Sequence, residues 1–162
     1  MSDLNALPER SRLVQRAIAD AGLSATVREL PDSTRTAAEA AAALSCEIGA
    51  IGSSLLFLSD GEPVLVMTSG RHRVDTDFLA GQLSASRIEM ASAKQVRAIT
   101  GQAIGGVAPI GHPTQLRTVI DEALSDYETV WTAAGTPHTV VPLTFEELVS
   151  LTRGSVLKVA AD

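Results

Sequence analysis

The sequence predicts one domain of mixed α/β class, without a regular strand–helix–strand alternation. Its 162 residues are the size of an ordinary domain, and a hydrophobic content of 45% can fill a core. Three segments carry a Ser or Thr three residues before a Glu or Gln, the capping box that opens helices. Two apolar runs flank Asp60-Gly61, a hairpin signal. Because no repeat or linker interrupts the chain, we expect residues 1–162 to form one domain.

The first elements are predicted by periodicity. Apolar residues recur at helical spacing from Pro8 to Ala21, and Gly22 is placed to end the helix. We therefore expect an N-terminal helix within residues 1–22, packed on the domain. In residues 25–30, apolar and polar positions alternate in part, with Val27 and Leu30 beside Arg28 and Glu29, which predicts a strand.

The central and C-terminal elements follow from caps and apolar runs. The runs 55–58 and 64–67 are apolar at nearly every position, so we expect a central hairpin covered on both faces. The remaining predicted helices are 36–44, 75–83, 92–99 and 144–151, and the remaining predicted strands are 130–131, 139–141 and 156–159.

Charge and hydropathy exclude several classes of protein. The net charge of −6 gives no general attraction to nucleic acid, so DNA is not an expected partner. Arg71 and Arg73, near His72, are either a local RNA-binding patch or ordinary surface charge. No apolar stretch approaches the roughly 18 residues that span a bilayer, and the N-terminus has no signal core. We expect a soluble, cytoplasmic protein with no membrane partner.

Cysteine and histidine give few chemical candidates. Cys46 is the single cysteine and is either a nucleophile or a small buried residue. The three histidines, His72, His112 and His138, have no metal-ligand spacing, so we expect neither a metal nor a cofactor. No Ser-His-Asp or Cys-His set stands out.

Residues 100–113, TGQAIGGVAPIGHP, are rich in glycine and carry no acidic or basic residue other than one histidine. Gly105 and Gly106 allow a sharp turn and a close approach of a ligand to backbone N–H groups, which can hold a carbonyl or an oxyanion. The alternative is a tight bend in which glycine permits close packing. The pattern is neither a P-loop nor a dinucleotide fingerprint.

This segment resembles the signature of the YbaK/ProX-type aminoacyl-tRNA deacylases, relatives of the prolyl-tRNA synthetase editing domain. The resemblance extends to VRELPDSTRTAAEAAAAL, SSLLFLSDGEPVLVMTSGRHRVD and TAAGTPHTVVPLTFEELVSLT, in the family's order. It implies a compact domain with one pocket, in which helices surround a mixed, barrel-like sheet. It also implies hydrolysis, in trans and without a cofactor, of a small misacylated amino acid from the acceptor end of a tRNA. An aminoacyl-tRNA synthetase is a further candidate partner.

The resemblance also assigns candidate site residues. The loop from Gly105 to Pro109 is similar to the loop that presents backbone groups to the ester, with water as the nucleophile. We expect Gly105, Gly106 and Ser53 in catalysis. The expected substrate-binding residues are Ser54, Val107, Ala108, Pro109, Gly111, His112, Gly135 and His138. A structural, hydrogen-bonded role is the alternative for each histidine.

One position departs from the family. Ser53 stands where the family usually has a lysine that contacts the terminal nucleotide's phosphate. Loss of a charge-assisted contact costs on the order of 1–3 kcal/mol, or roughly tenfold to a hundredfold in rate or affinity. Three explanations are open. Another basic residue, such as Arg71 or Arg73, replaces the lysine; the substrate differs; or the protein binds without hydrolysing. The candidate functions are thus a deacylase, a binding module for aminoacyl-tRNA or a small ligand, and a small-molecule esterase.

Overall fold

All three capping boxes open helices in the computed structural model, which describes residues 7–161. In each, the hydroxyl of the first residue accepts the backbone N–H three residues on, and that residue's side chain accepts the N–H of the first. The helices of the described residues are α1 (Glu9–Asp20), α2 (Ala37–Leu44), α3 (Thr76–Leu83), α4 (Ala93–Thr100) and α5 (Phe145–Thr152), with 3₁₀ turns at Ile48–Ala50 and Glu122–Asp126. The predicted helices are confirmed within two residues at their ends, while the part of the 1–22 segment that falls on residues 1–6 lies outside the described residues.

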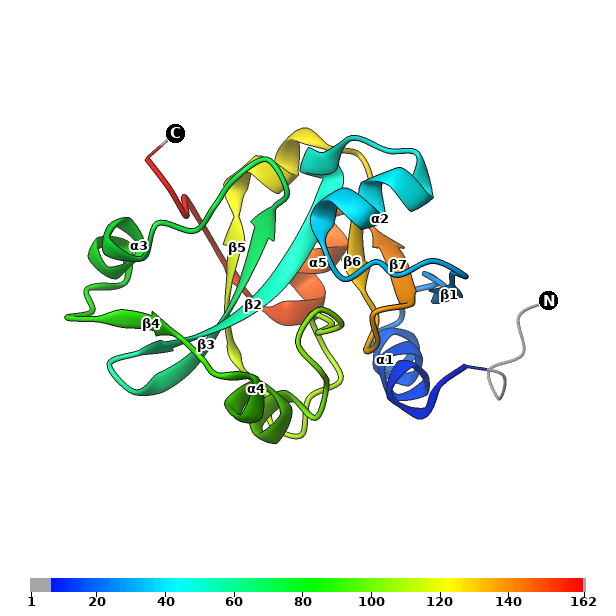
Figure 1. Ribbon diagram of the computed structural model, residues 1–162, viewed down its shortest axis with the longest axis horizontal. Helices are drawn as coiled ribbons and strands as arrows, with labels where there is room; N and C mark the ends of the chain where they lie inside the picture. Colours follow the sequence, from blue (N-terminus) through cyan, green and yellow to red (C-terminus); the bar gives the residue numbers. More distant parts are fainter. Residues whose placement is uncertain (1–6, 162) are drawn as a thin grey trace.

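Eight strands form one mixed sheet in the order β1-β7-β6-β2-β3-β5-β8, with β4 paired to β2 (Figure 1). The pairs β2–β6, β3–β5 and β5–β8 are parallel, and the others are antiparallel. The strands are β1 (Arg28–Glu29), β2 (Ile51–Ser59), β3 (Glu62–Ser69), β4 (Ile88–Met90), β5 (Arg117–Asp121), β6 (Val130–Ala133), β7 (Thr139–Leu143) and β8 (Ser155–Leu157). The predicted mixed α/β fold is confirmed.

The predicted hairpin is β2–β3, and its environment differs between the two strands. β3 is buried from Val64 onward, because its side chains alternate between two core clusters: Leu65 and Met67 pack in one, and Val64 and Val66 in the other. In β2, Ser53, Ser54 and Leu55 are only half-buried. The prediction of a hairpin covered on both faces is therefore correct for β3 and wrong for the middle of β2, where the sheet opens into a cavity.

Two strands, β4 and β5, have no counterpart among the predicted elements. β5 begins with Arg117 and Thr118 and ends with Asp121, so only Val119 and Ile120 are apolar neighbours. β4 is three residues long, and two of them are exposed. Neither segment carries an apolar run that sequence periodicity detects, and pairing with β3 and β2 decides their conformation.

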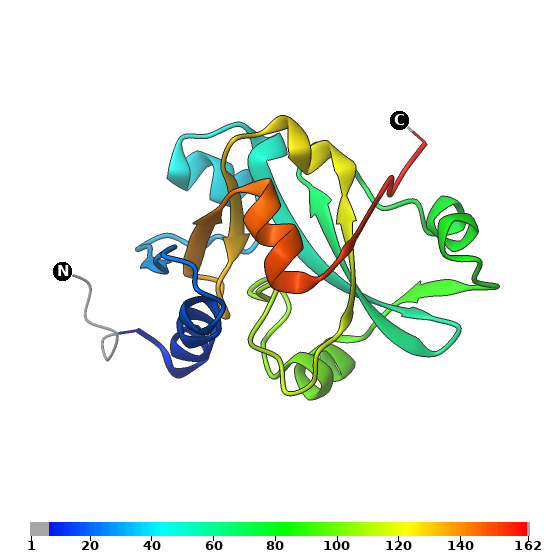
Figure 2. The same cartoon turned by 180° about the vertical axis from the view of Figure 1, so that it is seen from behind.

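Helices cover the sheet in two layers. α2 lies on the front face in Figure 1, and α5 crosses the back face, which Figure 2 shows toward the viewer. The largest core cluster joins α1, α4 and α5 to the sheet, and Val107 and Ala108 of the glycine segment belong to it. Among the helices described, none has the length and apolar character that crossing a bilayer requires.

Candidate functional site

The candidate site lies where β2 separates from its neighbour β6. The two strands pair only at Ile51–Trp131 and Gly52–Thr132, and β4 takes up pairing with β2 from Phe57. Between these ladders, residues 53–56 of β2 have no strand partner on the edge opposite β3 within the described residues. This gap in the sheet borders a cavity of about 720 Å³, within the size range of small-molecule sites.

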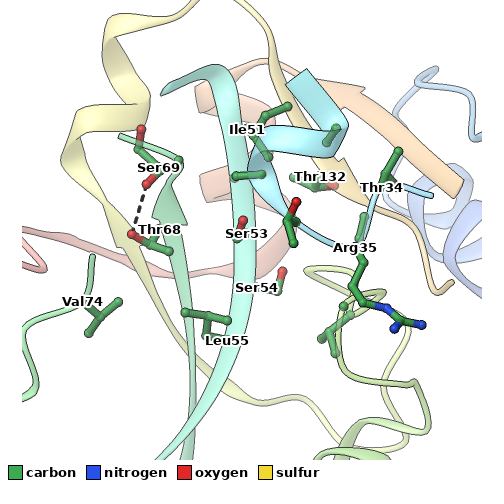
Figure 3. A pocket seen from close by; sticks show the side chains of 18 of the residues that line it. Thr34, Arg35, Ile51, Ser53, Ser54, Leu55, Thr68, Ser69, Val74 and Thr132 are labelled. Atoms are coloured by element: carbon green, nitrogen blue, oxygen red, sulfur yellow. Dashed lines mark hydrogen bonds between the residues drawn. The ribbon is translucent and has the colours of Figure 1, made fainter. Parts of the chain in front are cut away.

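Five parts of the chain surround this cavity, shown in Figure 3. They are the segment 34–37 before and at the start of α2, the first half of β2, the end of β3 with the residues after it, the glycine segment, and β6. Met90 of β4 and Val140 of β7 also line it; Met90 is 60% exposed, and Ile104 of the glycine segment is 49% exposed. Far-apart segments of the sequence therefore converge on one site.

Hydroxyl groups are the commonest polar groups of the lining. They belong to Thr34, Thr36, Ser53, Ser54, Thr68, Ser69, Thr76 and Thr132. Several of them are held by the protein: Thr34 donates to the carbonyl of Pro137 at 2.9 Å, and Ser69 to that of Gly49 at 2.7 Å. The Ser54 hydroxyl lies 2.9 Å from the sulfur of Met67. Ser53 and Ser54, both predicted site residues, thus line the cavity.

The glycine segment contributes two residues of the Gly105–Pro109 loop to the cavity, Gly105 and Val107. Gly105 has φ +87°, and a side chain there would strike the aliphatic part of Arg35. Positive φ and this close approach both require glycine.

Gly106 is engaged within the protein. Its N–H donates to the carbonyl of Ala103 and its own carbonyl accepts the N–H of Gly135, both at 2.9 Å. A Cβ on Gly106 would lie 2.5 Å from the carbonyl carbon of Thr136. In this structure Gly106 holds the loop against the 135–137 turn, the close packing that was the alternative reading of the segment.

The next residues of the segment face elsewhere. Ala108 is fully buried in the main core, and its N–H donates to Gln102 Oε1 at 2.7 Å. Pro109, Gly111 and His112 line a separate cavity of about 350 Å³. His112 Nε2 lies 2.8 Å from the Ala108 carbonyl, which can only accept, so the ring nitrogen donates. Burial lowers the pKa of His112, which favours the neutral ring.

The C-terminal pair of predicted residues also lies outside the large cavity. Gly135, at φ +107°, packs against the backbone of Arg10 in α1. His138 is exposed and lines a shallow hollow with Pro8 and Glu29. These two residues shape the turn that supports the Gly105–Pro109 loop.

The basic residues separate into two groups. Arg71 pairs with Asp126 at 2.7 Å and stacks over Tyr127, and the carboxylate raises its pKa. Arg73 lines the large cavity, as does Arg35, which sequence reasoning missed. Within the described residues neither Arg35 nor Arg73 forms an ion pair, and no Asp or Glu lines that cavity. The site is locally cationic although the chain is acidic.

His72 and Asp121 form a second feature that the sequence did not reveal. Asp121 is fully buried and accepts the N–H groups of Ser69 and Ala123, each at 3.0 Å. His72 lines the large cavity, and its Nδ1 lies 3.0 Å from Asp121 Oδ2. The carboxylate can only accept, so Nδ1 donates, and Nε2 is left to hydrogen-bond a water or ligand. The sequence did not reveal this pair because strand β5, whose last residue is Asp121, was not predicted.

The other chemical candidates are absent from the site. Cys46 is half-buried, packs near Ile51 and does not line the large cavity, and burial raises the pKa of its thiol. A raised pKa disfavours the nucleophilic thiolate. Residues 7–161 contain no group of three or more His, Cys, Asp or Glu placed to bind a metal ion.

Comparison with known proteins gives the family. The model of the aminoacyl-tRNA editing domain matches residues 31–151. A proline–tRNA ligase of Bacillus licheniformis is 37% identical over 109 residues, which cover 65% of this chain but only 19% of the ligase. EbsC of Enterococcus faecalis, named a "putative Cys-tRNA(Pro)/Cys-tRNA(Cys) deacylase", is 29% identical over 76% of each chain.

A solved structure agrees over nearly the whole chain. It is described as a "putative trans-editing enzyme for prolyl tRNA synthetase", with a TM-score of 0.89 and 38% identity, and the match covers 97% of this chain and 100% of that one. The fold and the resemblance predicted from the sequence are both confirmed. The chain belongs to the aminoacyl-tRNA editing domain family.

Proposed function

We propose that this protein is an aminoacyl-tRNA deacylase that acts in trans and removes a small misacylated amino acid. One observation carries the proposal. Among residues 7–161, the large cavity is lined by Gly105 of the family's loop, by two arginines without an ion-pair partner and by no carboxylate. Such a lining suits an ester attached to a polyanion. The near full-length likeness to a structure described as a trans-editing enzyme supports action on a free aminoacyl-tRNA.

The proposed reaction is hydrolysis of the ester. Water adds to the carbonyl carbon, the bond between that carbon and the ribose oxygen breaks, and the ribose oxygen takes a proton as the free amino acid leaves. The N–H groups of Gly106 and Ala108 are bonded inside the protein. Gly105 and Val107, which line the cavity, are therefore the loop residues whose N–H groups we expect to stabilise the oxyanion.

Arg35 and Arg73 are proposed to supply the charge that Ser53 lacks. Both line the cavity without an ion-pair partner among residues 7–161, whereas Arg71 is occupied by Asp126. An unpaired guanidinium can bind a phosphate through two parallel hydrogen bonds. The two guanidinium groups would then hold the phosphates of the terminal nucleotides of the tRNA.

The test is hydrolysis of a panel of aminoacyl-tRNAs carrying Ala, Ser, Cys and Pro, with wild type, Arg35→Ala and Arg73→Ala. We expect turnover of at least one small aminoacyl ester, and a loss of roughly tenfold to a hundredfold in kcat/KM for each variant. The salt dependence of KM should also become shallower. Arg16→Ala is the matched control, because Arg16 is exposed on α1 and does not line the cavity.

The presence of Ser53 in place of a lysine favours a second candidate function: a module that binds its ligand without turnover. Ser53 lines the cavity, and the resemblance aligns it with the lysine that the family usually has. Assay of Ser53→Lys beside wild type separates the two functions. Turnover by wild type supports the deacylase. Turnover by Ser53→Lys alone, with wild type binding the acceptor end, would make the natural protein a binder. Activity only on simple amino acid esters, insensitive to salt, would indicate a small-molecule esterase.

A further inference from the structure

One buried side-chain oxygen on the wall of the large cavity has no hydrogen-bond partner among residues 7–161. The Oγ1 atom of Thr132, on β6, is buried and makes no hydrogen bond within the described residues. The whole residue is 1% exposed, and it lines the cavity. In Figure 3, Thr132 lies to the right of Ser53, on the side of the cavity formed by β6. Thr132 is the register partner of Gly52, so it lies at the closed end of the gap, where β2 and β6 last pair.

A buried hydroxyl without a partner is unfavourable, because it has lost its hydrogen bonds to water. Valine has the same shape and would avoid this loss. The other well-buried hydroxyls of the lining already have acceptors in the protein, as Thr34 has in Pro137 and Ser69 in Gly49. Among the well-buried hydroxyls of the described lining, Thr132 therefore keeps unused hydrogen-bonding capacity at the closed end of the cavity.

We propose that Thr132 is a specificity-determining residue that hydrogen-bonds the hydroxyl of a seryl group on the bound aminoacyl ester. This inference rests on the proposed function, and it names the amino acid class of that same site. A hydroxyl can both donate to and accept from Thr132, a thiol does so weakly, and a methyl group does neither. The expected order of preference is Ser, then Cys, then Ala.

The experiment measures kcat/KM on Ser-tRNA and Ala-tRNA for wild type, Thr132→Val and Thr132→Ser. Wild type should prefer Ser over Ala by about tenfold, the effect of one well-placed hydrogen bond. Thr132→Val should bring this ratio to within about twofold by losing activity on Ser, and Thr132→Ser should keep it. Thr118→Val is the control, since Thr118 is buried outside the cavity and donates to the Leu116 carbonyl.

Stability gives a readout that is independent of turnover. Thr132→Val removes an unpaired buried hydroxyl, so its Tm should rise by about 2–6 °C, while Thr118→Val loses a hydrogen bond and its Tm should fall. A Tm of Thr132→Val below that of wild type would mean that the hydroxyl is satisfied in the free protein, and would overturn the inference.

Two outcomes separate this inference from the proposed function. If Thr132→Val lowers hydrolysis of Ser-tRNA and Ala-tRNA equally, the hydroxyl contacts a group common to all substrates and the specificity role is wrong, while the deacylase stands. If wild type hydrolyses no aminoacyl-tRNA, the proposed function fails. The inference is then tested by binding of 3′-seryl-amino-adenosine and 3′-alanyl-amino-adenosine, amide mimics of the ester. Equal affinity for the two mimics would refute it.

Discussion

Replacing Gly106 by alanine tests whether the Gly105–Pro109 loop depends on close packing. A Cβ at this position would lie 2.5 Å from the carbonyl carbon of Thr136, 2.7 Å from its Cα and 2.9 Å from the nitrogen of Pro137. These are backbone atoms, so no side-chain rotation relieves the contact. The loop must retreat from the 135–137 turn by almost 1 Å, and the hydrogen bond from the Gly135 N–H to the Gly106 carbonyl, 2.9 Å long, would lengthen or break.

The magnitude follows from these two effects. Overpacking costs about 1–3 kcal/mol, and the lost hydrogen bond costs about 0.5–1.5 kcal/mol. We expect the free energy of unfolding to fall by about 2–4 kcal/mol and Tm by about 5–15 °C. Because Gly105 and Val107 move with the loop, hydrolysis of the preferred aminoacyl-tRNA should also fall.

Urea unfolding followed by the fluorescence of Trp131, the single tryptophan, measures the change. Gly81→Ala is the matched control. A Cβ on Gly81, inside α3, meets nothing within 4 Å, so alanine there should stabilise the protein by about 0.5–1 kcal/mol. A Gly106→Ala variant as stable as wild type would refute the packing role of Gly106.

Three further substitutions test other parts of the structure. Asp121→Asn should lower the free energy of unfolding by about 2–4 kcal/mol in urea titrations, because an amide cannot accept all the hydrogen bonds that the buried carboxylate accepts from Ser69, His72 and Ala123. A loss below 0.5 kcal/mol, the scale of an ordinary surface substitution, would show that these bonds are not coupled to folding. Thr36→Ala should cost about 0.5–2 kcal/mol through loss of the capping box, and no change in Tm would contradict this. Burial lowers the pKa of His112 below its ordinary value of 6.5 in the folded protein. As the pH falls, the unfolded chain therefore binds a proton before the folded protein does. The free energy of unfolding should decrease as the pH drops from about 6.5 to the folded-state pKa. His112→Gln should flatten this part of the stability–pH curve, and equal slopes for the two proteins would argue against a buried neutral ring.

Local features of the sequence predicted most of the helices. A capping box involves residues three apart, as in Ser92 and Gln95, so its hydrogen bonds are specified by a short stretch of chain. The hairpin β2–β3 is similarly local, with Asp60 and Gly61 at its turn. Strand β5 was missed because its partners β3 and β8 are distant in sequence and its own residues carry no strong pattern.

The candidate site was predicted in part. The glycine segment and the two serines of β2 were identified from their order and resemblance, and Gly105, Val107, Ser53 and Ser54 do line the cavity. His138, predicted beside them, is exposed and lines a different hollow, because its position depends on how the 135–137 turn packs against α1.

The sequence by itself determined the family, the mixed α/β class, the helix starts and the glycine loop. Each of these follows from motifs whose residues are close together along the chain. Only the tertiary structure decided where the site opens and what lines it. The gap between β2 and β6 arises because their pairing ends at Gly52 and Thr132, residues 80 positions apart. That non-local pairing places at the end of the cavity a hydroxyl with no partner among residues 7–161, and the packing of Arg35 over Gly105 places a guanidinium at the loop. Neither the position of this hydroxyl nor that of the guanidinium is specified by any short segment of the sequence.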